Sequence, residues 1–154
     1  MGAEGVKVRF ATRDDVETIA EFNRRIALET EGLELDIERV RIGVRAHLDE
    51  PERRGTYRVA EIDGKVVGQI LVTLEWSDWR NAWWWWIQSV YTLPEARGQG
   101  VFRALYEHVE AAARSNPAVC GLRLYVEKEN GTAQRAYERI GMQRSSYAFF
   151  SKEL

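Results

Sequence analysis

The sequence predicts a fold of the α/β (α+β) class, in which helices pack on a mixed central sheet. The tight-turn dipeptide Asp63-Gly64 separates two apolar segments, residues 57–62 and 66–74, and this pattern predicts an antiparallel hairpin. Further along, a strand that ends near Thr92 is joined through a helix to an apolar segment at residues 121–126. Because such a crossover connects parallel neighbours, the sheet should contain both antiparallel and parallel pairs.

Each expected element has its own local signal. Alternation of apolar and polar residues predicts strands, and apolar residues three or four positions apart predict helices. In chain order, the expected elements are a strand at residues 6–10, a helix capped by Thr12, a second helix at residues 37–48, the hairpin, a tryptophan-rich segment leading into the strand that ends near Thr92, a helix from Gly100, a strand at residues 121–126, a helix that ends at Gly141 and a last strand at residues 147–150. His47 lies on the second helix, where we expect it to be exposed.

Composition and charge narrow the class of protein. With 154 residues, 45% of them hydrophobic and 30% charged, the chain is expected to form one globular domain over residues 1–154. A net charge of −2 without a basic tract argues against a nucleic-acid partner, and no apolar run is long enough to span a membrane. Cys120 is the single cysteine, which excludes an intramolecular disulfide and favours a reducing cytoplasm. No histidine–cysteine cluster has the spacing of a metal site, so no metal is expected.

The strand–turn–helix segment around residues 90–105 is the most informative part of the chain. Pro94 removes a backbone donor and ends the strand, and Gly98 and Gly100 allow a tight turn with a close approach of the backbone to a ligand. The helix begins near Gly100, and its first amides have no partner within the helix. These amides lie at the positive end of the helix dipole, so the segment predicts a site for an anion, above all a phosphate.

Two segments of the chain carry a family resemblance. Arg97-x-x-Gly100 after a strand resembles the pyrophosphate loop of the GNAT superfamily of acyl-CoA-dependent N-acyltransferases. That loop usually reads Gln/Arg-x-x-Gly-x-Gly/Ala, and Phe102 occupies the last position here. Residues 130–142 resemble the second signature of the family, Asn-x-x-Ala-x-x-x-Tyr-x-x-x-Gly-Phe, with Met142 in place of the phenylalanine. The resemblance covers essentially the whole chain.

The resemblance implies a fold and a cofactor. It implies a sheet of six to seven strands with helices on both faces and a splay between the strands that end at Thr92 and Val126. Acetyl-CoA would place its pantetheine arm in that splay and its pyrophosphate on the glycine-bearing loop. The residues that the resemblance assigns to acetyl-CoA are Val90, Tyr91, Thr92, Arg97, Gly98, Gln99, Gly100, Val101, Phe102 and Asn130. Asn130 equally suits the N-cap of the last helix, and both roles stay open.

Two residues are assigned to catalysis. The resemblance implies that Tyr137 gives a proton to the leaving thiolate, which suits a phenol with an ordinary pKa near 10; the alternative is a packed helix aromatic. Several family members carry a glutamate on the strand before the splay, but the tryptophan run occupies that position here. Glu75, Asp78 and the acidic residues 29–36 are the substitutes for this base, and Glu75 is the residue we assign.

The acidic residues 29–36 have two interpretations. One is a solvated loop between helices. The other is the lip of an amine site, because family members commonly build the acceptor site near this connection and carboxylates attract an ammonium group. Glu31 is the candidate residue for this second role.

Six tryptophans fall in one short segment, at Trp76, Trp79 and Trp83–Trp86. Alternate side chains of a strand face opposite sides of its sheet, so the run has two faces. One face should pack under a helix, and the other, with Trp84, Trp86 and Gln88, would lie along the acceptor channel. Core packing, a substrate wall with cation–π contacts and a homodimer interface are three open interpretations.

These observations predict an N-acetyltransferase that moves an acetyl group from acetyl-CoA to a small-molecule amine by direct attack in a ternary complex. The alternative is a non-catalytic module of the same fold that binds acyl-CoA or another protein. Tyr137 and Asn130 favour the enzyme, whereas the missing strand glutamate favours the module.

Overall fold

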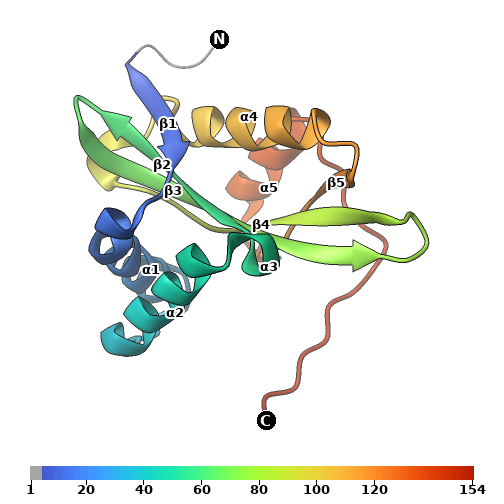
Figure 1. Ribbon diagram of the computed structural model, residues 1–154, viewed down its shortest axis with the longest axis horizontal. Coiled ribbons are helices and arrows are strands. Elements are labelled where there is room, and N and C mark those ends of the chain that lie inside the picture. The colour runs from blue at the N-terminus through green and yellow to red at the C-terminus, as the bar shows by residue number, and fades with distance from the viewer. Residues whose placement is uncertain (1–4) are drawn as a thin grey trace. The chain divides into compact units, whose positions relative to one another are not determined.

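The computed structural model describes residues 5–154, and contacts along the backbone divide them into two compact units. The first unit ends at Leu124 and the second runs from Tyr125 to Leu154. The first unit (Figure 1) contains β1 Val6–Phe10, η1 Arg13–Asp15, α1 Val16–Glu31, α2 Ile37–Asp49, α3 Pro51–Arg54, β2 Thr56–Ile62, β3 Lys65–Ser77, β4 Ala82–Thr92, η2 Pro94–Ala96, α4 Val101–Arg114 and β5 Val119–Leu124. The second unit contains α5 Gly131–Arg139.

The sheet is mixed, as the sequence predicts. Its five strands lie in the order β1-β2-β3-β4-β5; all neighbours are antiparallel except β4 and β5, which are parallel. Asp63 and Gly64 both have positive φ at the β2–β3 turn, as the hairpin pattern requires. The expected count of six to seven strands is wrong for the described residues, because residues 147–150 form no strand. Their aromatic side chains, including Phe150 at 91% exposure, have the composition of a strand but no neighbouring strand to pair with in their unit.

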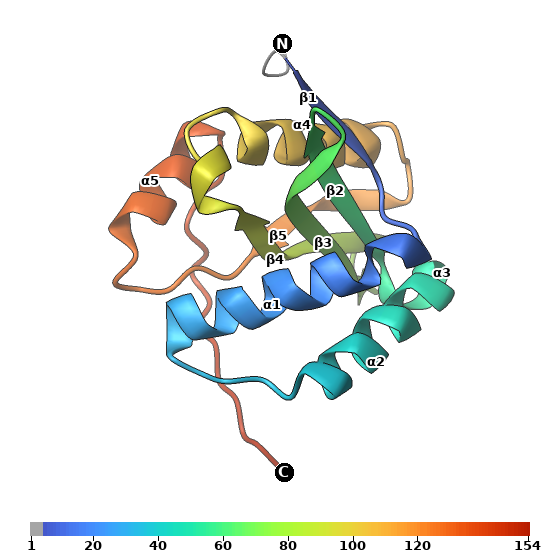
Figure 2. The same cartoon turned by 90° about the vertical axis from the view of Figure 1, so that its left-hand side faces the viewer.

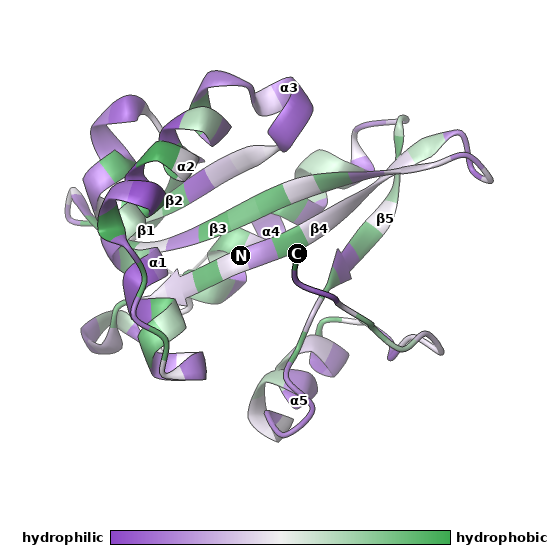
Figure 3. Ribbon diagram, turned by 90° about the horizontal axis from the view of Figure 1, so that it is seen from below, coloured by the Kyte–Doolittle hydropathy of each residue, from purple (hydrophilic) through white to green (hydrophobic). Residues whose placement is uncertain are grey.

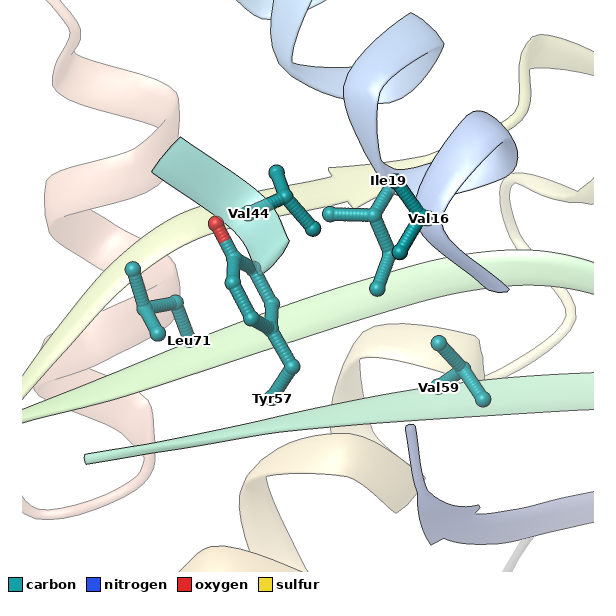
Figure 4. Packing of buried hydrophobic residues seen from close by; sticks show 6 residues of the cluster. All are labelled: Val16, Ile19, Val44, Tyr57, Val59 and Leu71. Atoms are coloured by element: carbon teal, nitrogen blue, oxygen red, sulfur yellow. The ribbon is translucent and has the colours of Figure 1, made fainter. Parts of the chain in front are cut away.

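Helices cover both faces of the sheet in the first unit. Figures 1 and 2 show α1 and α2 on one face and α4 on the other. The core under α1 and α2 consists of residues from two helices and two strands (Figure 4): Val16, Ile19, Val44, Tyr57, Val59 and Leu71. Full burial of such a side chain contributes about 1.5–3 kcal/mol, so this cluster fixes α1 and α2 on β2 and β3.

Gly68 allows α4 to approach the other face closely. A Cβ at this position would lie 2.7 Å from Val101 Cγ1 and 3.0 Å from the Tyr91 carbonyl oxygen, closer than packed atoms tolerate. The β2–β3 register also shifts beside Gly68. Gly68 therefore marks both a close approach of the backbone to α4 and an irregularity in the β2–β3 ladder.

The link from β1 to α1 is held by a buried charge with a full set of partners. Asp15 is 5% exposed, accepts hydrogen bonds from Arg9 at 2.7 and 2.9 Å and accepts another from the Thr12 amide at 2.7 Å. Thr12 and Asp15 form a capping box. Burial opposes ionisation of Asp15, but these hydrogen bonds outweigh it and lower its pKa.

One local expectation about the second helix needs correction. α2 ends at Asp49, before Pro51, and Pro51 opens the short helix α3, because its fixed φ and missing N–H suit the first turn of a helix. His47 is half-buried rather than exposed, and its ring packs edge-on against Tyr57 with a centroid distance of 5.2 Å.

The tip of the β3–β4 hairpin is a polar turn. Figure 3 shows the apolar middle of β3 giving way to a hydrophilic turn at residues 77–81. Figure 1 shows that this tip extends well beyond α1 and α2. Among residues 5–154, no helix combines the length and the apolar character needed to cross a bilayer.

The second unit is built around α5. Asn130 caps this helix, its Oδ1 accepting a hydrogen bond from the Ala133 amide at 3.0 Å. Gly141, with φ of +91°, follows the last turn, as a C-terminal glycine should. Tyr125 and Phe149 pack with ring centroids 4.8 Å apart.

Candidate functional site

β4 changes character after Ile87. Its parallel ladder with β5 ends at the Ile87–Leu124 pair, so within the first unit residues 88–92 have no partner strand on that side. On the other side, the antiparallel ladder with β3 shifts register, and Ser89 and Val90 together lie opposite Ile70. Ser89 has a φ of +47°, a left-handed conformation that is rare for residues other than glycine. The result is a β-bulge at the start of an open strand edge.

A buried polar network holds the bulge. Gln69 is fully buried, and its Nε2 donates to the Ser89 carbonyl at 3.2 Å and to Asn23 Oδ1 at 2.7 Å. Asn23 Nδ2 in turn donates to the Tyr57 hydroxyl at 3.2 Å. In a trans peptide the C=O and the N–H point in opposite directions, so the Val90 N–H points away from Gln69. The network thus fixes the direction of one backbone donor.

A pocket of about 390 Å³ lies beside this network, between α1, α2 and the bulge. Its floor includes Tyr57, Asn23 and Ser89, and Glu31 lies on its lining at the end of α1. Burial raises the pKa of Tyr57, so its phenol stays protonated at neutral pH. The pocket therefore combines neutral hydrogen-bonding groups with one carboxylate.

The acidic residues 29–36 divide between structural and pocket roles. Asp36 caps α2, accepting from the Glu38 amide at 3.0 Å. Glu29 pairs with Arg97 at 3.2 Å and accepts from the Tyr91 hydroxyl at 3.1 Å. Glu31 is the acidic residue of the stretch that lines the pocket.

The turn before α4 has the form expected for an anion site. Gly98 and Gly100 have φ of +79° and +81°, as the tight turn requires. The first hydrogen bond of α4 joins the Ala104 amide to the Gly100 carbonyl at 3.0 Å. Hence the three preceding amides, of residues 101–103, have no partner within the helix.

The side chains of this segment are engaged within the protein. Arg97 Nε donates to the Thr92 carbonyl at 3.1 Å, in addition to its pair with Glu29. Gln99 donates to the Glu95 carbonyl at 3.0 Å. The Phe102 ring lies 6.2 Å from that of Tyr106, one turn along α4. The loop therefore offers a ligand mainly its backbone amides.

The other end of β4 carries the tryptophans. Trp84 lies opposite Glu75, and Trp86 opposite Thr73. The Arg123 guanidinium lies 3.8 Å from the Trp84 ring centroid and 2.6 Å from Glu75 Oε2. Gly121 has no room for a Cβ, which would lie 2.4 Å from a Trp84 ring atom. The predicted residues Glu75, Trp84, Trp86 and Gln88 thus share one face of the sheet.

This end is remote from the bulge. Trp84 and Val90 are six residues apart on β4, which corresponds to about 20 Å along a strand. The structure therefore does not bring Glu75 to the bulge. Gln88 lies beside the bulge, and its Nε2 donates to Thr73 Oγ1 at 2.8 Å.

None of the six tryptophans is fully buried. Trp83–Trp86 are half-buried, and Trp76 and Trp79 are 49% and 86% exposed. Core packing alone does not account for them. The substrate-wall and interface interpretations stay predictions.

The second unit carries the remaining predicted residues. Tyr137 lies on α5, and burial raises its pKa, which keeps the phenol protonated. Asn130 has the N-cap role described above, and its contact with acetyl-CoA stays a prediction.

Sequence reasoning missed the residues that hold the bulge. In the sequence, Asn23 falls within a helical pattern of apolar spacing and Tyr57 within a strand pattern, and neither pattern marks a site. A signal was present at Gln69, because a glutamine inside an apolar run of strand residues must find partners when buried. Ser89 gave none.

Comparison with known proteins agrees with this geometry. The family model of the acetyltransferase (GNAT) family matches residues 16–142. An aminoalkylphosphonate N-acetyltransferase of Salmonella typhimurium is 31% identical over 145 residues, covering 93% of this chain and 88% of that protein. A possible acetyltransferase from Clostridium difficile 630 is 44% identical with a TM-score of 0.90, covering 98% of this chain and 99% of that one.

A third comparison concerns the fold alone. A predicted acetyltransferase with acetyl-CoA from Clostridium acetobutylicum has a TM-score of 0.77 at 16% identity, with 96% of both chains covered. The chain belongs to the GNAT family of acetyltransferases, and it is an N-acetyltransferase that takes its acetyl group from acetyl-CoA.

Proposed function

We propose that this enzyme acetylates a small-molecule amine by direct attack in a ternary complex, at the bulge of β4. The observation that carries the proposal is the open edge at residues 88–92, which has a fixed backbone donor beside it and a pocket next to it. An open strand edge is a hydrogen-bonding template for an extended ligand.

Acetyl-CoA fits the open edge of β4 and the turn before α4. The backbone of residues 90–92 would bind the acyl and pantetheine portion, and the amides of residues 98–102 would bind the pyrophosphate. Arg97 and Gln99 would support the loop through their bonds to Thr92 and Glu95. Phe102 would contribute its amide, and Asn130 would contribute to the cofactor arm in addition to capping α5.

The acceptor would enter through the pocket of about 390 Å³. Glu31 would attract the ammonium group, while Tyr57 and Asn23 would orient the amine by hydrogen bonds. Gln88, Trp86 and Trp84 would contact longer acceptors that extend along β4 toward its tryptophan end.

The reaction needs a neutral amine, a polarised carbonyl and a protonated leaving group. The amine nitrogen forms a bond to the thioester carbon, whose oxygen is stabilised by the Val90 amide, and the carbon–sulfur bond breaks. Tyr137 gives its proton to the sulfur, and burial, which raises its pKa, ensures that the phenol still carries that proton at neutral pH. The amine nitrogen loses its proton to water, and Glu75, opposite Trp84 and about 20 Å from the bulge, would receive that proton only through a chain of waters.

The Salmonella relative suggests the class of acceptor. Its name describes an enzyme that acetylates aminoalkylphosphonates. We propose a primary amine on a short chain for the present enzyme as well, and a phosphonate-bearing amine is the first compound to try.

Three broader predictions accompany this function. The family model spans both units, which supports one functional domain over residues 1–154. Exposed Trp76 and Trp79 support a homodimer formed through the hairpin tip. The single Cys120 supports a location in the reducing cytoplasm.

The test is a screen of short primary amines, with and without a phosphonate group, followed by Tyr137→Phe on the best acceptor. We expect kcat to fall by about 100-fold, since general acid catalysis contributes that order of magnitude, with the Kd for acetyl-CoA unchanged. Tyr147→Phe, at an exposed tyrosine of the same unit, is the matched control and should retain full activity.

Two outcomes would count against the proposal. An unchanged kcat in Tyr137→Phe would remove the tyrosine from the reaction. Binding of acetyl-CoA without turnover of any amine in the screen would favour a chain that uses the fold only for binding.

A further inference from the structure

A second cavity lies on the face of the sheet that carries α4, opposite the pocket beside the bulge. It has a volume of about 470 Å³, within the range of small-molecule sites. Residues of all five strands, of α3 and of α4 line it, among them Phe10, Arg58, Val72, Trp83, Trp85 and Ala112. The tryptophans that face away from Trp84 and Trp86 thus form part of its wall.

Arg58 is a buried charge in the lining of this cavity. It is 2% exposed, and its Nε donates to His108 Nδ1 at 3.0 Å while Nη1 donates to Thr56 Oγ1 at 2.9 Å. No carboxylate among residues 5–154 forms an ion pair or hydrogen bond with it. Asp15, the other buried charge, is paired with a guanidinium. A buried charge without an opposite partner is costly, so Arg58 needs an explanation.

Two features leave a single positive charge available in the cavity. A guanidinium has five N–H donors, and the two neutral acceptors use one at Nε and one at Nη1. His108 accepts at Nδ1 and is therefore neutral, and burial together with Arg58 lowers its pKa. Burial lowers the pKa of Arg58 to about 10, which still leaves it charged at neutral pH.

The side chains that line the cavity indicate which kind of ligand would fit it. The guanidinium carbon of Arg58 lies 4.7 Å from the Phe10 ring centroid and 6.0 Å from that of Trp85. Val72 and Leu74 add aliphatic surface. Glu52 also lines the cavity, and its carboxylate would disfavour a ligand with a second negative charge.

We propose that this cavity binds a small monocarboxylate with an aromatic or branched apolar body, its carboxylate on Arg58 and its body against Trp83 and Trp85. One negative charge would neutralise the one uncompensated positive charge through a charge-assisted hydrogen bond. A dianion such as a phosphate monoester would carry excess charge into an apolar wall and face Glu52. This site is separate from the acetyl-transfer site and does not depend on the proposed acceptor.

The first experiment uses the wild-type enzyme without acetyl-CoA and measures binding of phenylacetate by calorimetry and tryptophan fluorescence. Its neutral isostere phenylacetamide is the control ligand. We expect saturable binding of one phenylacetate per chain and at least tenfold weaker binding of the amide. Equal binding of acid and amide, or no saturable binding of phenylacetate up to about 10 mM, just beyond the millimolar affinity that a single charged anchor provides, would overturn the proposal.

The second experiment fills the cavity. Ala112 lines it, so Ala112→Phe should weaken phenylacetate binding at least tenfold. Ala111→Phe, at the exposed neighbouring position on α4, is the matched control and should bind as the wild type does. Unchanged binding in Ala112→Phe would place the ligand elsewhere and refute the assignment. The ligand pair on wild-type enzyme keeps the test decisive even if a variant folds poorly.

Discussion

The two ends of β4 are built differently although they belong to one strand. At residues 83–87, β4 is paired on both sides, and its tryptophans pack against charged groups such as Arg123 and Arg58. At residues 88–92, the β5 ladder has ended, the strand bulges at Ser89, and the groups beneath it are the neutral Gln69 and Asn23. The first end therefore offers aromatic and charged side chains, whereas the second leaves backbone groups on an open strand edge.

This difference implies that substitutions at the two ends of β4 should have different effects on activity. Changes to the groups that hold the bulge should lower kcat, because they move or remove a donor aimed at the reacting carbonyl. Changes at the tryptophan end should alter binding or stability with little effect on the chemical step. The following variants test that difference in order of decreasing effect.

Among the variants described here, Gln69→Leu should have the largest effect on stability and on kcat. It removes the donor that holds the Ser89 carbonyl and leaves that oxygen and Asn23 Oδ1 unpaired, which should destabilise the fold by about 1–3 kcal/mol. We expect kcat to fall by roughly tenfold or more as the Val90 amide loses its orientation. Thermal melting and initial rates measure both quantities.

Gln88→Leu is the matched comparison for Gln69→Leu. Its side chain bonds Thr73 rather than the bulge, so it should raise the KM for the acceptor while kcat changes by less than about twofold. Equal losses of kcat in the two variants would contradict a special role for Gln69.

The tryptophan end should give the enzyme a pH-dependent stability. Burial and the nearby Arg58 lower the pKa of His108, so the unfolded chain binds a proton more readily than the folded one. The contribution of the neutral histidine is therefore fully present above pH 6.5 and is lost as pH falls through the lower pKa of the folded state. His108→Gln should flatten the fall of Tm between about pH 7 and pH 5.

His47 provides the control for that measurement. Its pKa is also lowered, by burial and by Arg54, so the His47→Gln variant should keep the part of the pH dependence that comes from His108. If His108→Gln and wild type lose stability in parallel, the neutral state of His108 is not required for the fold.

The smallest effect is expected at the pocket rim. Glu31→Gln should raise the KM for an amine acceptor by roughly threefold with unchanged kcat, because an exposed carboxylate contributes little to attraction of an ammonium group. Glu34→Gln, in the same acidic stretch but outside the pocket lining, should leave KM unchanged. A similar rise in KM in both variants would mean that the effect comes from the net charge of the acidic stretch and not from a contact in the pocket.

Features that depend on local interactions could be predicted from the sequence, whereas features that depend on contacts between distant residues could not. The Asp63-Gly64 turn and the Gly98 and Gly100 turn were predictable, because positive φ at glycine and aspartate is a local preference. The last strand at residues 147–150 was not, since its aromatic residues favour a strand only where a partner edge exists.

The candidate site shows the same limit. The anion loop and Tyr137 belong to motifs read along the chain, whereas the bulge depends on a register between two strands. Ser89 is held in its left-handed conformation from outside, by a glutamine twenty positions earlier in the chain. Arg58 gave no signal either, because nothing local shows that a strand arginine will be buried without a carboxylate.

The central claim is that acetyl-CoA binds along the open end of β4 with its pyrophosphate on the amides before α4. The most direct test compares thermal melting with and without saturating acetyl-CoA for wild type, Arg97→Glu/Gly100→Trp and Arg114→Glu. Arg114 lies at the far end of α4 and controls for the charge change. At 100 times Kd the ligand should stabilise wild type and Arg114→Glu by about 2.7 kcal/mol, roughly 5–10 °C, and should leave the double variant unshifted. An equal shift in all three proteins would contradict the claim.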